Sequence, residues 1–346
     1  MKKKQLTGAA GVIAGLIIIA VCFFLDQKTL PKKPITRSDF LLNTFVTVTI
    51  YDSNDENLLT QCMDLCREYE NRFSKTLSGS EIYKLNHRNP EDTVFTVSDD
   101  TAALIRKEIY FSQLSDGAYD LTIEPLSSLW DFTSGKTQIP PQSAIDEAVS
   151  RIGYQNLSLD GNTLTFLSPD TTLDLGSIAK GFIADRLKDY LVEQGVESAI
   201  INLGGNVLCI GSLPDGSPFS IGIQKPFADH SETVGYVEIT DMSVVSSGVY
   251  ERHFVLDGKN YHHLLNPQTG YPYDNGLISV TIISPESVDG DALSTACFSL
   301  GLEKGIELLD SISDTCGIFI TEDYEIHYSE GAKELLIRDS KDSDTF

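Results

Sequence analysis

Hydrophobic and polar positions follow two periods along the chain, and these separate the expected strands from the expected helices. Residues 45–50 (FVTVTI) alternate at period two, which predicts a half-buried strand. Apolar residues three and four apart predict amphipathic helices over 56–71, 98–114 and 177–193. Further strands are expected at 164–166, 198–203, 219–223, 236–239, 244–246, 278–283 and 317–321, and further helices at 143–152, 292–300 and 304–309.

The order of these elements predicts the fold class. Helices and strands mix without strict alternation, so an α+β fold with mixed or antiparallel sheets and packed helices is favoured over a doubly wound sheet. At 346 residues the chain is long enough for one large domain or two closely joined ones. We expect the folded domain over 34–338, between an N-terminal segment with its linker at 1–33 and a polar tail at 339–346.

The N-terminus has the composition of a membrane-targeting segment. Three lysines at 2–4 precede a nearly uncharged run over 6–25, and about 20 apolar residues are enough to span a bilayer. The sequence around Cys22 (IAVC) has a faint similarity to a lipoprotein cleavage site. An uncleaved anchor is therefore favoured, with lipidation at Cys22 and a cleaved signal as the alternatives. Each of the three places residues from about Asp26 onward outside the cytoplasm, and an anchor or a lipid would hold them at the extracytoplasmic face of the cell membrane.

The charge of the chain limits its partners. With 26 Lys and Arg against 50 Asp and Glu, the formal net charge is −24, and such a surface repels nucleic acid. A phosphate group must then be bound locally, by backbone donors, a lysine or a metal ion. The alternative explanation of this acidity is that it serves solubility alone. Five cysteines beyond Cys22 have irregular spacing, which indicates neither a disulfide framework nor a zinc site.

Residues 246–295 hold the first candidate chemistry. His263 leads into a loop (NPQTGYP) that Pro and Gly make rigid. Asp291 and Thr295 stand four apart at the expected start of an apolar helix, so their oxygens share one helical face. Hard oxygen ligands of this kind suit Mg²⁺, which takes few protein carboxylates and leaves other positions to phosphates and water. A helix cap with a satisfied hydroxyl is the alternative interpretation.

The second candidate stretch is DLGSIAKG. Asp174 is expected to close a strand, and Gly176 and Ser177 to start a helix whose first turn carries Lys180. A helix start offers free N–H donors and a positive dipole end, which together attract anions; the alternative is a plain N-cap with a solvated lysine. Residues 202–206 (NLGGN) indicate either a tight turn or a close approach of backbone to ligand. Neither a P-loop nor a GxGxxG motif is present.

These stretches together resemble one family. TFVTVTI, GAYDLTIEPLSSLW, DLGSIAKGFIADRL, INLGGN, SSGVYERHF, HHLLNPQTGYP and DALSTA occur in the order and spacing of the ApbE-type flavin transferases. The resemblance covers about residues 43–301. It implies an ApbE-like fold of two intimately joined subdomains, FAD as substrate and Mg²⁺ as cofactor. The implied reaction moves FMN from FAD to a Thr or Ser hydroxyl of a flavin-carrier protein and releases AMP.

The resemblance also implies roles for single residues. Asp291, Thr295 and the main-chain carbonyl of Ser177 match the metal ligands. His263 matches the family's histidine near the reacting phosphoryl group, and with Asp291 it is a catalytic candidate; the general base is His263 or an aspartate. Matches to cofactor-contacting positions are Ala118, Tyr119, Asp120, Asp174, Lys180 and Leu265.

Three positions depart from the family pattern. Asn266 stands where the family often has an Asp that would orient His263. Leu42 replaces a Met that makes an apolar cofactor contact. Thr76 replaces an aromatic residue, so one surface for stacking on the flavin is missing. None of the three is a metal ligand.

The resemblance implies a partner as well, and two other functions stay open. The expected acceptor is a flavin-carrier subunit of a membrane electron-transfer complex, of the Rnf type or similar to sodium-pumping quinone reductases. One alternative is a Mg²⁺-dependent FAD pyrophosphatase, in which water replaces the acceptor hydroxyl and the products are FMN and AMP. The other is an FAD-binding lipoprotein without catalysis.

Overall fold

The computed structural model describes residues 33–229 and 232–337. The expected apolar anchor and the polar tail both lie outside these ranges, and so does Cys22. Among the described helices, none has the length and apolarity needed to cross a membrane.

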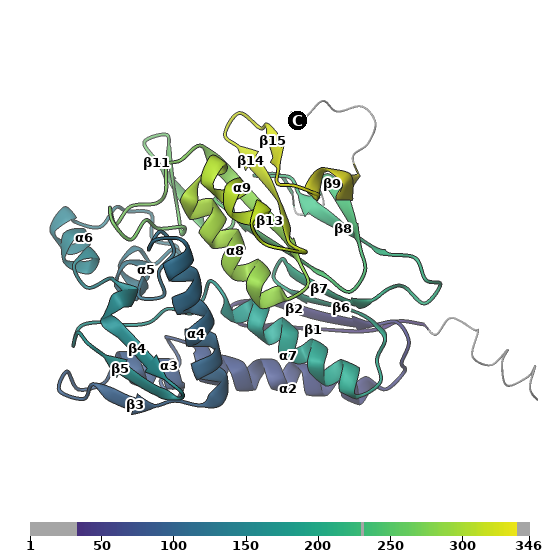
Figure 1. Ribbon diagram of the computed structural model, residues 1–346, viewed down its shortest axis with the longest axis horizontal. Helices are drawn as coiled ribbons and strands as arrows, with labels where there is room; N and C mark the ends of the chain where they lie inside the picture. The colour runs from purple at the N-terminus through teal and green to yellow at the C-terminus, as the bar shows by residue number, and fades with distance from the viewer. Residues whose placement is uncertain (1–32, 230–231, 338–346) are drawn as a thin grey trace, which may run out of the picture.

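An eight-stranded sheet forms the centre of the molecule (Figure 1). All of its neighbouring strands pair antiparallel. The alternation of 45–50 is explained by its second strand, where Val46, Val48 and Ile50 are buried and the residues between them are not. In sheet order the strands are β1 (Ile35–Leu41), β2 (Thr44–Ile50), β6 (Ser198–Leu203), β7 (Asn206–Gly211), β10 (Ser243–Gly248), β13 (Leu277–Ser284), β14 (Cys316–Thr321) and β15 (Ile326–Tyr328).

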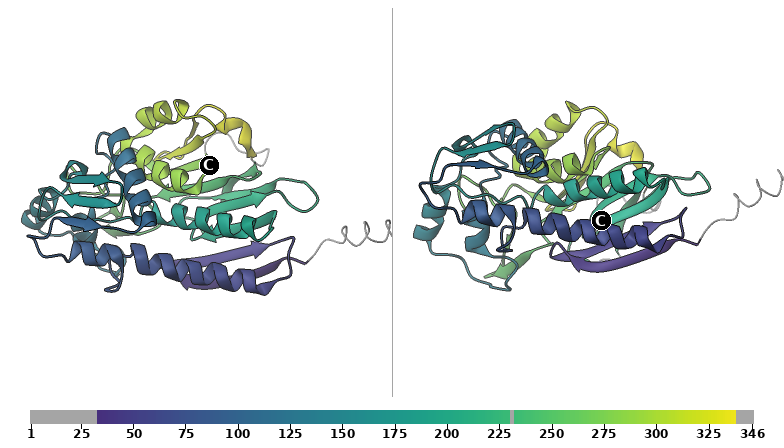
Figure 2. Two further views of the ribbon diagram at one scale, coloured as in Figure 1. Left: turned by 60° about the horizontal axis from the view of Figure 1, so that its bottom comes forward. Right: turned by 90° about the horizontal axis from the view of Figure 1, so that it is seen from below.

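The longer helices that pack against this sheet are α2 (Glu56–Phe73), α7 (Ala179–Glu193), α8 (Ser287–Leu300) and α9 (Leu302–Asp310). Figure 2 shows α2 and α7 side by side, and they contact each other. Helix α7 also contacts α8, and α8 lies on β10 and β13. The two helices that carry the candidate chemistry, α7 and α8, therefore meet directly above the middle of the sheet.

The remaining elements flank the sheet. Two hydrophobic clusters hold them together: a large one that spans most of the molecule, and a small one around Trp130, Phe254 and Leu265. The elements are α3 (Glu81–Asn86), α4 (Asp99–Leu114), α5 (Glu124–Trp130), α6 (Gln142–Val149), α10 (Ala332–Leu335), the 3₁₀ turn Tyr154–Asn156, the sheet of β3 (Val94–Thr96), β5 (Thr163–Phe166) and β4 (Leu157–Asp160), the hairpin of β11 (His253–Leu256) and β12 (Lys259–His262), and the sheet of β16 (Leu336–Ile337), β9 (Thr233–Ile239) and β8 (Phe219–Gln224).

The predicted α+β class with antiparallel sheets is confirmed, and two local predictions are wrong. Asp174 does not close a strand, because the chain around it is an irregular loop tied down by side chains. Asp291 does not start its helix: α8 begins four residues earlier, at Ser287, where an aspartate of α7 accepts its free N–H groups. An apolar pattern alone gave no sign of that polar first turn.

Candidate active site

The crossing of α7 and α8 is the framework of the site. Gly181 lies at the closest approach, where an added Cβ would stand 2.3 Å from the carbonyl oxygen of Ser287. One turn later, the two carboxylate oxygens of Asp185 accept from the backbone N–H groups of Ser287 and Val288, at 2.9 and 2.8 Å. The GFIAD sequence of α7 thus supplies both the close contact and the N-terminal cap of α8.

Asp291 is held at this crossing with part of its binding capacity unused. Its Oδ2 accepts from the Gly181 N–H at 2.8 Å, and its Oδ1 lies 4.0 Å from the Lys180 ammonium, beyond hydrogen-bond distance. Burial raises the pKa of Asp291, and the Lys180 charge, the Gly181 hydrogen bond and the Asn206 side chain only partly offset it. One turn further along α8, the Thr295 hydroxyl lies 3.2 Å from that of Ser247.

Asp174 is held by a full set of contacts. Its Oδ2 lies 2.8 Å from the Lys75 ammonium and accepts from the Ser127 hydroxyl at 2.7 Å, while Oδ1 accepts from the Gly176 N–H at 3.0 Å. Burial alone would raise the pKa of Asp174, but the Lys75 charge and these hydrogen bonds outweigh it and lower the pKa below its ordinary value. Lys75 and Ser127 were not identified from the sequence.

Beneath Ser177 lies a buried pair, Tyr119 and Glu108. The Ser177 hydroxyl donates to the Tyr119 hydroxyl at 3.0 Å. Glu108 of α4 is fully buried, and neither of its carboxylate oxygens has a hydrogen-bond partner in the described part of the chain. Burial, opposed by the nearby Tyr119 hydroxyl, raises the pKa of Glu108 well above its ordinary range.

His263 follows β12 and is tied to the loop after β10, because its backbone N–H donates to the Arg252 carbonyl at 3.1 Å. Burial, together with the positive charges of Arg252, His262 and Lys180, lowers the pKa of His263 to about 3. The imidazole is thus neutral at pH 7, and in the protein without substrate it is a weak base. Its Nδ1 has no hydrogen-bond partner among the described residues.

Asn266, which stands where the family often has an Asp, closes the turn that follows His263. The Asn266 side-chain oxygen accepts from the backbone N–H groups of Gln268 and Thr269, at 2.8 and 3.2 Å, and so closes its own loop. The side chain is used for the turn, and the orientation of His263 comes from the backbone of the hairpin instead.

The other predicted residues make their contacts elsewhere. Asp120 accepts from the N–H and hydroxyl of Thr122 in its own loop and from the N–H of Tyr154 in the 3₁₀ turn. Leu265 packs in the small cluster around Trp130. Leu42 occupies the β1–β2 turn at φ 55°, with its N–H donating to Glu70. The Ala118 carbonyl accepts from Tyr273, and Thr76 is exposed.

The chemistry of these side chains fits a magnesium ion. The predicted ligands would supply one carboxylate, one hydroxyl and one carbonyl, all hard oxygens, and Asp291 is buried with Oδ1 free of protein hydrogen bonds. No cluster of three or more Asp, Glu, His or Cys side chains suited to a metal occurs in residues 33–229 and 232–337. A magnesium site completed by phosphates needs no such cluster.

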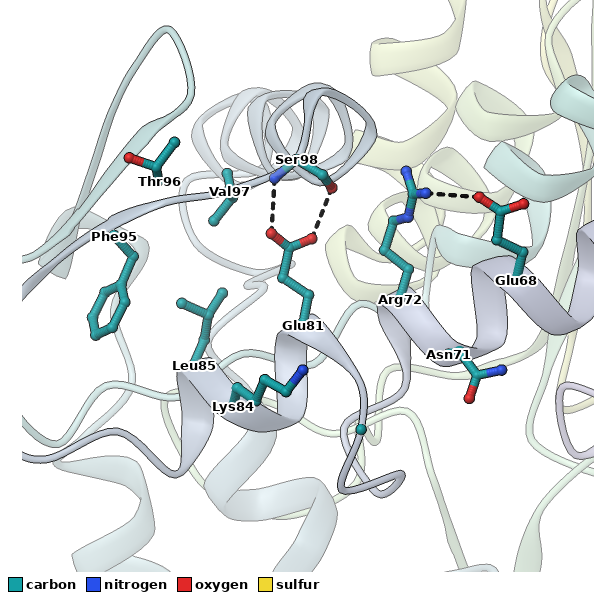
Figure 3. Close-up of a pocket in the computed structure, with 11 residues that line it drawn as sticks. Glu68, Asn71, Arg72, Glu81, Lys84, Leu85, Phe95, Thr96, Val97 and Ser98 are labelled. Atoms are coloured by element: carbon teal, nitrogen blue, oxygen red, sulfur yellow. Dashed lines mark hydrogen bonds and ion pairs between the residues drawn. The ribbon is translucent and has the colours of Figure 1, made fainter.

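A cavity of about 580 Å³ opens elsewhere, between α2, α3 and the chain leading into α4 (Figure 3). None of the predicted site residues lines it. Most of its charged side chains are already engaged: Glu81 accepts from the N–H and hydroxyl of Ser98, and Arg72 pairs with Glu68 and Asp100. We therefore place the candidate site at the α7–α8 crossing and not in this cavity.

Sequence comparisons point to one family. A model of the ApbE family matches residues 42–320. The FAD:protein FMN transferase of Klebsiella pneumoniae (strain 342) is 40% identical over 291 residues, which cover 84% of this chain and 90% of the relative. The FAD:protein FMN transferase of Treponema pallidum (strain Nichols) is 30% identical over 315 residues, with coverages of 86% and 87%.

Solved structures agree with the sequence comparisons. The flavin transferase ApbE from Vibrio cholerae superposes with a TM-score of 0.79 at 27% identity, over 88% of this chain and 99% of that one. The ApbE protein from Thermotoga maritima gives a TM-score of 0.81 at 30% identity, over 88% of this chain and all of that one.

Proposed function

Because the chain belongs to the ApbE family and has the fold of its flavin transferases, we propose that it transfers FMN from FAD to a Thr or Ser hydroxyl of a flavin-carrier protein with the help of Mg²⁺. The transferase activity on a protein follows from the relatives. The metal ion, the acceptor side chain and the roles of single residues are the finer part of the proposal.

One observation carries the metal site: the buried carboxylate of Asp291, which has Oδ1 free of hydrogen bonds beside the Lys180 ammonium. Asp291, Thr295 and the carbonyl of Ser177 would hold the ion. When bound, Mg²⁺ would neutralise the negative charge of the FAD pyrophosphate and favour departure of AMP.

The protein's own groups supply the rest of the reaction. Lys180, in the first turn of α7, adds a positive charge beside the diphosphate, and the helix N-terminus adds N–H donors. His263 would accept the proton of the acceptor hydroxyl, because the negative charge of bound FAD raises the low pKa of the imidazole toward the range that a general base needs. The hydroxyl oxygen forms a bond to the FMN phosphorus, the bond from that phosphorus to the bridging oxygen breaks, and AMP leaves with that oxygen.

The location and the partner are further parts of the proposal. The apolar run over 6–25 supports attachment to the cell membrane with the enzyme at its extracytoplasmic face. A carrier subunit of a membrane electron-transfer complex, of the Rnf type or similar to sodium-pumping quinone reductases, would be accessible there. Release of free FMN and AMP by water is the second candidate function, because neutral His263 would serve a water molecule equally well.

The decisive experiment combines the full-length protein, FAD, Mg²⁺ and a flavin-carrier domain, followed by intact-mass spectrometry of the carrier. We expect a mass gain of one FMN that disappears with EDTA and with a carrier whose acceptor Thr is changed to Ala. An unmodified carrier together with free FMN and AMP would favour the hydrolase. FMN transfer at full rate in EDTA would refute the metal requirement.

A further inference from the structure

Asn206 is a buried polar side chain beside the site for which the reaction described so far has no role. It is the first residue of β7 and only 1% exposed. Its Oδ1 accepts from the hydroxyl of Ser287, the first residue of α8, at 2.7 Å. Its Nδ2 is buried and has no partner within ordinary hydrogen-bond geometry among the described residues, but it lies close enough to the Asp291 carboxylate to lower the pKa of that group.

The backbone fixes Asn206 in this place. The preceding turn needs Gly204 at φ 65°, where an added Cβ would stand 2.0 Å from the Thr44 hydroxyl oxygen. Asn206 then pairs with Leu203 of β6 on one side and with Val245 of β10 on the other. The residue sits inside the sheet, directly after a rigid turn, so its amide has little freedom to point elsewhere.

A buried amide donor without a hydrogen-bond partner costs free energy, so we looked for the acceptor that it serves. The acceptor beside it is a carboxylate with unused capacity, since Oδ2 of Asp291 is engaged by the Gly181 N–H and Oδ1 is not hydrogen-bonded. A metal-binding carboxylate is commonly oriented by hydrogen bonds from such neighbours.

We propose that Asn206 is a positioning residue, whose amide and the Gly181 N–H together orient the Asp291 carboxylate for binding the divalent cation. The NLGGN sequence is then both a tight turn and a part of the site, because the glycines deliver the amide to α8. This inference rests on the metal site of the proposed function.

The test compares Asn206→Leu with Ser287→Ala. Asn206→Leu keeps the shape of the side chain and removes the amide donor. Ser287→Ala removes only the hydroxyl that Asn206 accepts from, and leaves the amide free to serve Asp291. Affinity for Mn²⁺ is measured for the FAD-loaded proteins from the electron paramagnetic resonance signal of free Mn²⁺, and unfolding by urea is followed in parallel.

We expect Asn206→Leu to weaken Mn²⁺ binding by about 10- to 100-fold, and Ser287→Ala to leave it within about threefold of the wild type. Equal Mn²⁺ affinity in all three proteins would make Asn206 a strut between β7 and α8 and overturn the proposal. Wild-type protein that binds no Mn²⁺ would overturn the metal site and this proposal together, whereas FMN transfer to the carrier would still be measured separately. Should Asn206→Leu fail to fold, Asn206→Ser carries the same comparison.

Discussion

Asp174 and Asp291 are two carboxylates in similar surroundings that are used in opposite ways. Each side chain is at most 18% exposed, and each has one lysine beside it. Asp174 has its lysine at 2.8 Å, with a hydroxyl and a backbone N–H completing its contacts, and its pKa is lowered. Asp291 has its lysine at 4.0 Å, and its pKa is raised because burial prevails.

We expect this difference between a carboxylate that stabilises the fold and one that binds a ligand. The contacts of Asp174 satisfy both of its oxygens and join the loop before α7 to the end of α2 and to α5. In Asp291, Oδ2 accepts from the Gly181 N–H, whereas Oδ1 lies near the Lys180 ammonium but beyond hydrogen-bond distance. A buried carboxylate in that condition is stabilised by whatever positive charge binds next to it.

The largest expected effect is that of Asp291→Asn on catalysis. The amide keeps an oxygen for the Gly181 N–H, so the crossing of α7 and α8 should stay intact, but the negative charge for the metal is lost. We expect the rate of FMN transfer to fall about 10²- to 10³-fold with little change in the urea midpoint. Rates come from the intact mass of the carrier over time. A variant that retains most of its activity would remove Asp291 from the metal site.

This contrast was only partly predictable from the sequence. The spacing of Asp291 and Thr295 placed them on one helical face, because helical periodicity is a local property. The ion pair of Lys75 with Asp174 joins residues 99 positions apart (174 − 75), and no local pattern indicates such a contact. For Asn206 the sequence indicated the turn, but the target of its amide depends on where α8 lies.

The difference between local patterns and long-range contacts also explains which strands could be predicted from the sequence. Strand β2 shows period-two alternation because one of its faces is buried. Strand β1 was not predicted, because it is an edge strand with mostly polar and exposed positions. Strand β7 was not predicted either: it lies between β6 and β10 and its buried positions follow no alternation.

The next largest effect distinguishes the two lysines. Lys75→Met leaves the largely buried charge of Asp174 without its counter-ion, so we expect a loss of about 1–3 kcal/mol in the free energy of unfolding. Lys180 makes no hydrogen bond to the described residues, so the loss of unfolding free energy in Lys180→Met should stay within about 0.5 kcal/mol. Urea titrations of both variants measure these values.

The affinities for FAD should show the reverse order. Lys180→Met removes a positive charge that we assign to the diphosphate, and we expect FAD binding to weaken about 10-fold or more. Folded Lys75→Met keeps that charge and should bind FAD within about threefold of the wild type. Both are measured by quenching of FAD fluorescence. Equal losses of FAD affinity would mean that the two lysines share one role and that the contrast is wrong.

The smallest expected effect is the pH dependence of the stability that Asp174 contributes. The change in unfolding free energy with pH is no larger than the free energy that the ion pair with Lys75 provides. The pKa of Asp174 is lower in the folded protein than in the unfolded chain, so the unfolded chain binds the proton first as the pH falls. Its stabilising effect is therefore complete above the unfolded pKa of about 4 and is lost as the pH falls through the lower folded value. The difference in unfolding free energy between wild type and Asp174→Asn should be constant from pH 7 to 5 and shrink toward pH 3. A difference that grows on acidification would show that Asp174 gains its stability from contacts of the protonated carboxyl and not from Lys75.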